Sequence, residues 1–197
     1  YECGVFEESQ YFKEFETYLT RHFHNDGRKH MSVANSSWDT WLDGYVQGIP
    51  GRKTSIYTEG ALIAYICDMR IRKATNNDAS LHNVMQEMYK LAKTGKGYTE
   101  TDYRNLLEKI SGESFEDIFI NLLHGTSDFT PFIIEALGYE GWKFEAKPST
   151  KEYENFGLKG SWKNGSFQIT NILEGSTAEK SGLIPSDAIH SINGIRI

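Results

Sequence analysis

The chain has 197 residues, of which 39% are hydrophobic, 24% charged and 13% aromatic, and its formal net charge is −6. This composition excludes disordered, collagen-like and low-complexity chains and predicts a globular protein with a sizeable core. The acidic excess lies before Lys147 and leaves no basic stripe for phosphates, so we expect no nucleic-acid partner. The longest apolar stretch, residues 61–67, is far shorter than the roughly 20 residues of a membrane-spanning helix, and no such segment is predicted.

Amphipathic spacing predicts helices throughout the first 138 residues, which are expected to form an all-α bundle. The expected segments are residues 6–23, a short helix through Trp38, Trp41 and Leu42 capped by Ser36 or Ser37, a helix starting close to Tyr57 or Thr58, and residues 81–91, 99–110, 114–123 and 131–137. Residues 61–69 are apolar on nearly every face, which predicts burial on all sides at the centre of the bundle. Asp68 and Arg72, four residues apart, can form an ion pair there.

Caps define two of these helices. Thr99 with Asp102, and Ser114 with Asp117, resemble acidic variants of a capping box, so each pair is expected to open a helix.

The composition changes after Gly138. Tyr139, Trp142 and Phe144 alternate with polar residues and predict a strand-like segment, followed by a linker at residues 148–150. Strands are then expected at residues 156–158, 167–173 and 188–192, with a short helix over 178–181 and turns at 163–165 and 193–194. The predicted fold class is α+β, with a helical domain over residues 1–147 and a β-rich domain over residues 148–197.

Motifs for metal and nucleophile chemistry are missing from the sequence. None of the six histidines belongs to an H-E-x-x-H pair or a Cys/His cluster, so no metal site is expected in this chain. His22 and His24 are two residues apart and point to different faces of a helix, so we expect exposed side chains rather than a ligand pair. There is also no G-x-S-x-G elbow, P-loop or dinucleotide-binding fingerprint.

The C-terminal segment resembles a PDZ domain. The matching residues are F-G-L-K-G from Phe156, I-T-N-I-L-E-G-S-T-A-E-K-S-G-L from Ile169 and I-P-S-D-A-I-H-S-I-N-G-I-R-I from Ile184. The resemblance implies that Phe156, Gly157 and Leu158 form the loop that binds a peptide carboxylate, with peptides or polypeptide termini as partners. Ser186 departs from the glycine usual before the aspartate. The second helix and final strand of such a domain would lie beyond Ile197, so we expect a partial PDZ-like domain with weak or no peptide binding.

The first 145 residues resemble the C-terminal half of the catalytic region in glycyl aminopeptidase-like zinc metallopeptidases, in which a PDZ domain follows a thermolysin-like domain. The matching residues are G-V-F-E-E-S-Q-Y-F near the start, G-R-K-H-M-S-V-A-N-S-S-W-D-T-W from Gly27, S-I-Y-T-E-G-A-L-I-A-Y-I-C-D-M-R-I-R from Ser55 and L-L-H-G-T from Leu122. The resemblance implies a zinc cofactor whose ligands lie upstream of Tyr1. Asn35 stands where an acidic residue is usual. The first residue is not Met and no signal sequence follows it, so we expect a piece of a longer protein, whose compartment and oligomeric state the sequence does not indicate.

Tyr57 is the catalytic candidate that this resemblance implies. It occupies the tyrosine position of the S-x-Y-x-x-G-A motif, whose hydroxyl donates a hydrogen bond to the developing oxyanion. The alternative is an aromatic side chain at the start of a helix that packs on the bundle. Asp68, Arg70 and Arg72 also fall in the motif and are expected to have structural roles.

Two function classes follow. One is a fragment of a zinc-dependent aminopeptidase, inactive by itself, with a PDZ module that engages peptides. The other is a non-enzymatic peptide-binding or scaffold protein built on a peptidase-like helical domain and a PDZ domain.

Overall fold

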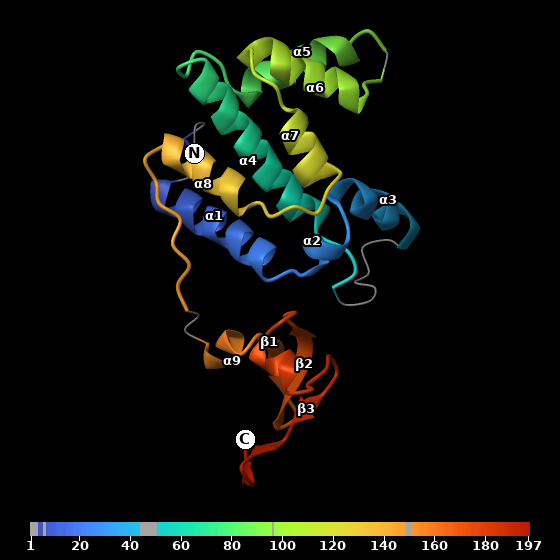
Figure 1. The fold of residues 1–197 in the computed structure, drawn as a ribbon, viewed down its shortest axis with the longest axis vertical. Coiled ribbons are helices and arrows are strands. Elements are labelled where there is room, and N and C mark those ends of the chain that lie inside the picture. Colours follow the sequence, from blue (N-terminus) through green and yellow to red (C-terminus); the bar gives the residue numbers. More distant parts are fainter. Residues whose placement is uncertain (1–3, 6, 44–50, 96, 149–150) are drawn as a thin grey trace.

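The computed structural model describes residues 4–5, 7–43, 51–95, 97–148 and 151–197. It has a helical part and, at its C-terminal end, a smaller β-rich unit (Figure 1). The predicted α+β class is therefore confirmed. In the described ranges, no helix is both long and apolar enough to cross a membrane.

Helix α4 is the centre of the helical part. The elements of this part are, in chain order, α1 (Glu8–Phe23), α2 (Gly27–His30), α3 (Val33–Asp43), α4 (Ile56–Ala74), α5 (Leu81–Ala92), α6 (Glu100–Ser111), α7 (Glu116–Ile118), the π-helical turn η1 (Phe119–Leu123) and α8 (Thr130–Tyr139). Helices α1, α3, α5, α6 and α8 all contact α4, as the apolar run in its sequence predicts (Figure 1).

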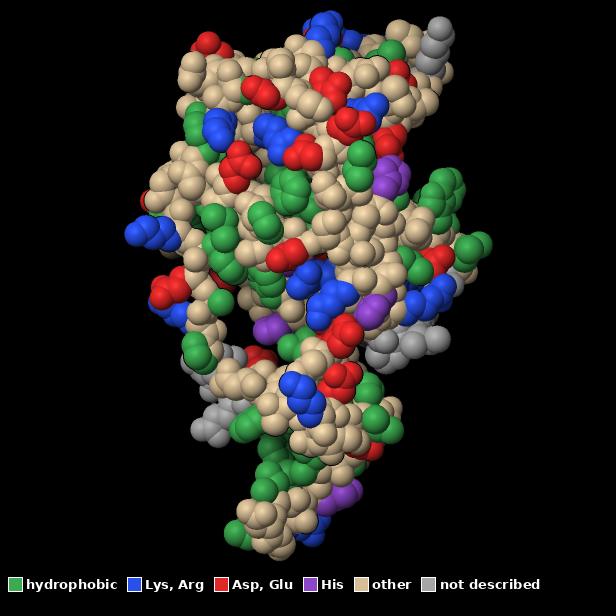
Figure 2. Space-filling view, viewed as in Figure 1, with side chains coloured by type: hydrophobic (Ala, Val, Ile, Leu, Met, Phe, Trp, Pro, Cys, Tyr) green, Lys and Arg blue, Asp and Glu red, His purple; other side chains and the backbone are tan. Residues whose placement is uncertain are grey.

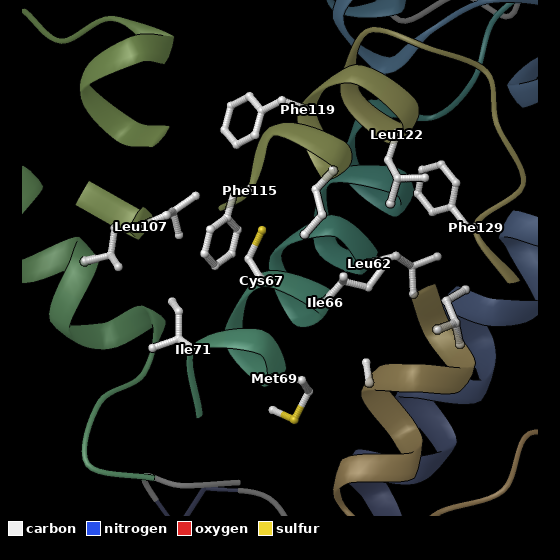
Figure 3. Close-up of a cluster of buried hydrophobic side chains, with 14 of the residues drawn as sticks. Leu62, Ile66, Cys67, Met69, Ile71, Leu107, Phe115, Phe119, Leu122 and Phe129 are labelled. Carbon is white, nitrogen blue, oxygen red and sulfur yellow. The ribbon is translucent and has the colours of Figure 1, made fainter. Parts of the chain in front are cut away.

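The core lies between α4 and its neighbours. Figure 3 shows Leu62, Ile66 and Cys67 of α4 among side chains of α6, of η1 and of the segments that precede α7 and α8. Complete burial of each large apolar side chain contributes about 1.5–3 kcal/mol to the stability of the fold. Burial also raises the pKa of the Cys67 thiol to about 12. The expectation of burial on all sides is wrong for one face, because Ala61 is exposed and Tyr65 is half-buried, with its hydroxyl donating to Glu140.

Helix starts follow side-chain caps, although not always the predicted ones. Thr99 and Asp102 form the expected capping box of α6. At α3, the backbone N–H of Asn35 donates to Ser32 Oγ, so the helix begins at Val33 and not after Ser36.

The capping box predicted at Ser114 and Asp117 is wrong. The carboxylate of Asp117 accepts two hydrogen bonds from the Arg70 guanidinium, at 2.5 and 2.8 Å. A bidentate partner of opposite charge is a stronger competitor than a backbone N–H at the helix start. The same stretch also contains the short α7 and the π-helical η1 instead of one continuous helix.

The strand-like segment predicted after Gly138 is also wrong. Tyr139 ends α8, and residues 142–148 have no regular secondary structure. The aromatic side chains pack on α1 instead: the rings of Trp142 and Phe12 lie 4.4 Å apart, and those of Phe144 and Phe23 lie 5.3 Å apart. The alternation reflects two aromatic anchors and not a pleated strand.

The β-rich unit is a small antiparallel sheet with short helices. Its elements are α9 (Glu152–Asn155), β1 (Leu158–Lys163), β2 (Ser166–Ile172), α10 (Thr177–Lys180), β3 (Ala188–Ile189), β4 (Ser191–Ile192) and β5 (Ile195–Arg196). The order of the main sheet is β1-β2-β3, and β4 and β5 form a separate hairpin. The predicted turn joins β1 to β2, with positive φ angles at Asn164 and Gly165. Leu158, Phe167, Ile169 and Ala178 form the core of the unit.

Ser186 has a φ of 81°, in the left-handed region that favours glycine. Its N–H donates to the carbonyl of Ile169, which holds the loop before β3 against β2. The position therefore has the backbone conformation for which glycine is suited, and the serine found here carries strain.

Candidate functional site

Tyr57 lies in the first turn of α4, where its side chain is 64% exposed. Ser55 caps this helix by accepting a hydrogen bond from the N–H of Thr58. The start of α4 lies beside α2 and α3 (Figure 1). The structure thus places the predicted catalytic tyrosine at the surface.

Helix α3 exposes one apolar face near this position. Trp38, Trp41 and Leu42 are spaced three and four residues apart and are 74%, 85% and 83% exposed. Figure 2 shows hydrophobic side chains protruding at this edge of the molecule. Asn35 is also exposed on α3.

A buried polar pair lies directly behind the first turn of α4. His22 Nδ1 of α1 is 2.6 Å from Glu59 Oε2, and both side chains are at most 1% exposed. The other carboxylate oxygen of Glu59 accepts a hydrogen bond from Thr54 Oγ1, which accepts one from the Asn25 amide. The expectation that His22 is exposed is wrong, because α1 turns this face toward α4.

The ring of His22 is enclosed by aromatic side chains. The rings of Phe23 and Phe129 each lie 4.8 Å from it, and Nε2 has no hydrogen-bond partner among the described residues. Leaving a buried polar atom unpaired costs about 1–3 kcal/mol. No motif in the sequence indicated this pair, and the only signal was a glutamate directly before the apolar run of α4.

The loop before α4 lies close to the start of α2. A Cβ atom added to Gly27 would lie 2.2 Å from the carbonyl oxygen of Lys53, so only glycine fits there. The N–H of Thr54 donates to Ser36 Oγ of α3. Helices α2 and α3 therefore both contact the segment that leads to Tyr57.

The charged residues that follow in α4 have contacts within the fold. Asp68 accepts hydrogen bonds from Arg72, as the spacing predicted, and from the N–H of Leu81 at the start of α5. Arg70 binds Asp117 and the carbonyl of Ser114. These contacts join α4 to its neighbours.

The described residues contain no group of three or more His, Cys, Asp or Glu side chains that could hold a metal ion. The described residues therefore do not by themselves fit a zinc site.

Phe156, Gly157 and Leu158 connect α9 to β1. The N–H groups of Phe156 and Gly157 donate to the carbonyls of Tyr153 and Glu154, while Leu158 pairs with Ile172 of β2. Gly157 has a φ of 82°, and a Cβ added there would lie 2.2 Å from the Cβ of Ser176. A peptide carboxylate would have to compete with the two internal hydrogen bonds of this loop.

The β-rich unit contacts the helical part through polar groups. Lys159 Nζ of β1 donates to the carbonyl of His24, and the N–H of Glu174 donates to the Asp26 carboxylate at 2.6 Å. Burial is the main cause that lowers the pKa values of both Lys159 and His24. Figure 2 shows charged and histidine side chains gathered where the two parts meet.

Comparisons with known proteins support the resemblance to glycyl aminopeptidases. Residues 1–63 match the model of the M61 glycyl aminopeptidase family. The crystal structure of an aminopeptidase N family protein from Idiomarina loihiensis is similar to this chain, with a TM-score of 0.83 and 23% sequence identity. The alignment covers 98% of this chain but only 35% of that protein, and at this identity it shows the fold. No curated protein matches the chain.

Proposed function

We propose that this chain, whose first 63 residues match the glycyl aminopeptidase family, forms the C-terminal helical part of an aminopeptidase catalytic domain, followed by part of a PDZ-like module. The observation that supports this proposal most directly is the position of Tyr57: it is exposed in the first turn of the central helix and lies within the matched residues. The proposal places the zinc ligands and the general base upstream of Tyr1.

In this proposal, the Tyr57 hydroxyl donates a hydrogen bond to the oxygen that gains negative charge when the peptide carbonyl is attacked. Such a donor acts because its bond is stronger in the transition state than in the substrate complex. The Ser55 cap and the contacts of the preceding loop fix the start of α4, and this supports a role of Tyr57 as hydrogen-bond donor. A donor to the oxyanion must be held in place before the reaction.

The test is Tyr57→Phe in the longer protein that the proposal implies, because this substitution keeps the ring and removes only the donor. We expect kcat to fall roughly 10²–10³-fold, about 2.7–4 kcal/mol, with little change in melting temperature. Tyr89→Phe is the matched control, since Tyr89 is 63% exposed on α5, away from the start of α4. Unchanged kcat in Tyr57→Phe would contradict the assignment.

The upstream sequence provides a simpler test. An H-E-x-x-H motif with a later glutamate before Tyr1 supports a metallopeptidase. Its absence favours the non-enzymatic alternative, in which the helical part only supports peptide binding.

The open edge of β1 favours peptide engagement in either case. β1 ends the sheet order, and its outer edge is unpaired by any strand in the part of the chain that the structure describes. An extended peptide can add to such an edge through backbone hydrogen bonds. Titration of peptides with free C-termini tests this, and we expect stronger binding when the chain is extended beyond Ile197; equal affinity would count against it.

A further inference from the structure

Removing His22 and Glu59 from water costs free energy, and a contribution to stability does not explain why such a pair is present here. Both side chains are removed from solvent, and the ring of His22 lies between two phenylalanine rings with Nε2 unpaired among the described residues. Replacing a buried polar pair by apolar side chains of similar size is often neutral or stabilising. We therefore expect this pair to have a role other than stabilising the fold.

The position of the pair indicates that role. Glu59 is in the first turn of α4, two residues after Tyr57, and its two oxygens are held from different directions by His22 and Thr54. An apolar contact in this place would resist separation of α1 from α4 but would leave the helix freer to rotate. Directional hydrogen bonds to both oxygens fix the rotation of this turn as well as its distance from α1.

The partners of the pair are themselves fixed. Thr54 accepts from Asn25, and its N–H donates to Ser36 of α3. The close approach of Gly27 to Lys53 holds the same loop. The network therefore joins α1, the α1–α2 connection and α3 to the turn that carries Tyr57.

We infer that His22 and Glu59 are positioning residues that hold the first turn of α4, and with it the Tyr57 hydroxyl, in the orientation needed for oxyanion stabilisation. This inference rests on the proposed function. The inference predicts that apolar side chains in place of the pair preserve the stability of the fold. The orientation of the first turn of α4, however, should be lost.

The test is the double substitution His22→Leu with Glu59→Met, which replaces the pair by apolar side chains of similar size. In this chain, hydrogen exchange of the Thr58 and Glu59 amides reports on the turn, because both donate to Ser55. We expect a melting temperature within a few degrees of the unmodified chain and roughly tenfold faster exchange of these two amides. Unchanged exchange at an unchanged melting temperature would overturn the inference.

Thr54→Val is a milder variant that leaves His22 and Glu59 in place and removes the hydroxyl that donates to Glu59 Oε1 and accepts from the Asn25 amide. It is used if the double variant does not fold. It should accelerate the same two amides by a smaller factor, and no acceleration would count against the inference. Ile71→Val is the control on the same helix: Ile71 is fully buried near its other end, so this change should lower the melting temperature without affecting exchange at Thr58 and Glu59.

Kinetics of the longer protein separate this inference from the proposed function. We expect the double variant to lose roughly 10- to 10²-fold in kcat with KM within about twofold, because misplacement by about 1 Å can cost that much. If Tyr57→Phe lowers kcat and the double variant does not, the positioning role is wrong and the proposed function stands. If Tyr57→Phe has no effect, the proposed function fails, and the positioning role fails with it.

Discussion

The helical part and the β-rich unit bury their side chains in different ways. The helical part surrounds α4 with a continuous cluster that includes Leu62, Phe115 and Ile133. The β-rich unit has a core of Leu158, Phe167, Ile169 and Ala178, and several of its strands have only two residues. Because small units bury a smaller fraction of their surface, the second depends more on single backbone positions and on its polar contacts with the first.

Among the substitutions that test this difference between the two cores, we expect the largest effect at the centre of the helical part. Phe115 is completely buried and lies next to Cys67 and Leu107 in Figure 3. Phe115→Ala should lower the free energy of unfolding by about 3–5 kcal/mol, because it removes the side chain and leaves a cavity. Urea denaturation followed by far-ultraviolet circular dichroism measures the loss. A loss below about 1 kcal/mol would contradict the description of a tightly packed core.

Gly157 tests the dependence of the β-rich unit on single backbone positions. Gly157→Ala places a methyl group against Ser176 in addition to the left-handed φ of 82°. Gly182→Ala is the matched control, because its φ is 80° and a Cβ there meets no described atom within 4 Å. We expect about 1–2 kcal/mol of destabilisation for the control and more for Gly157→Ala, measured by hydrogen exchange of β1 and β2. Equal losses would mean that the loop shifts to admit the methyl group.

The contact between the two parts should give a smaller effect. Asp26→Ala removes the carboxylate that accepts from the N–H of Glu174 and pairs with Lys29. We expect the contact to lose about 1.5–3 kcal/mol, seen as faster exchange of the Glu174 amide with the helical core unaffected. Lys29→Ala keeps the Asp26 carboxylate and removes two partly exposed ion pairs of Lys29, with Asp26 and with Glu174, and should cost about 0–1 kcal/mol. If the two variants behave alike, the Asp26 hydrogen bond does not hold the units together.

The smallest effect concerns acid stability of the helical part. The hydrogen bond from Arg70 is the main cause that lowers the pKa of Asp117 below its ordinary value. Because the folded pKa is depressed, the contribution is present above the unfolded pKa of about 3.9 and is lost as pH falls through the folded value. Asp117 is 46% exposed, so we expect less than about 1 kcal/mol.

Urea denaturation of the unmodified chain and of Asp117→Asn at several pH values from 7 to 3 measures this contribution. The difference between them should narrow below about pH 4. A difference that grows in acid would show that the sign is wrong.

Sequence reasoning succeeded where the signal was local. The capping box at Thr99 and Asp102, the turn at Asn164 and Gly165 and the apolar run of α4 each depend on residues close in the chain. It failed at two places where a residue distant in the sequence is the partner. Asp117 binds Arg70 instead of capping its helix, and Trp142 packs on Phe12 of α1 instead of lying in a strand. Propensity and spacing contain no information about such partners.

The same limit applies to the candidate site. Tyr57 belongs to a motif, and the structure places it at the surface in the first turn of α4. The pair of His22 and Glu59 spans 37 residues of sequence and belongs to no motif, so it could be found only in the folded chain. The roles of Tyr57 and of Phe156, Gly157 and Leu158 stay predictions.

The outer edge of β1, which pairs with no strand among the described residues, also has a consequence for the behaviour of the protein in solution. An exposed strand edge can pair with the same edge of another molecule and so begin aggregation. Lysine side chains discourage such pairing, and β1 ends in the exposed Lys163. Replacing Lys163, at the hairpin end of the strand, by an apolar residue should therefore reduce solubility at high concentration even if the fold of the isolated molecule is unchanged.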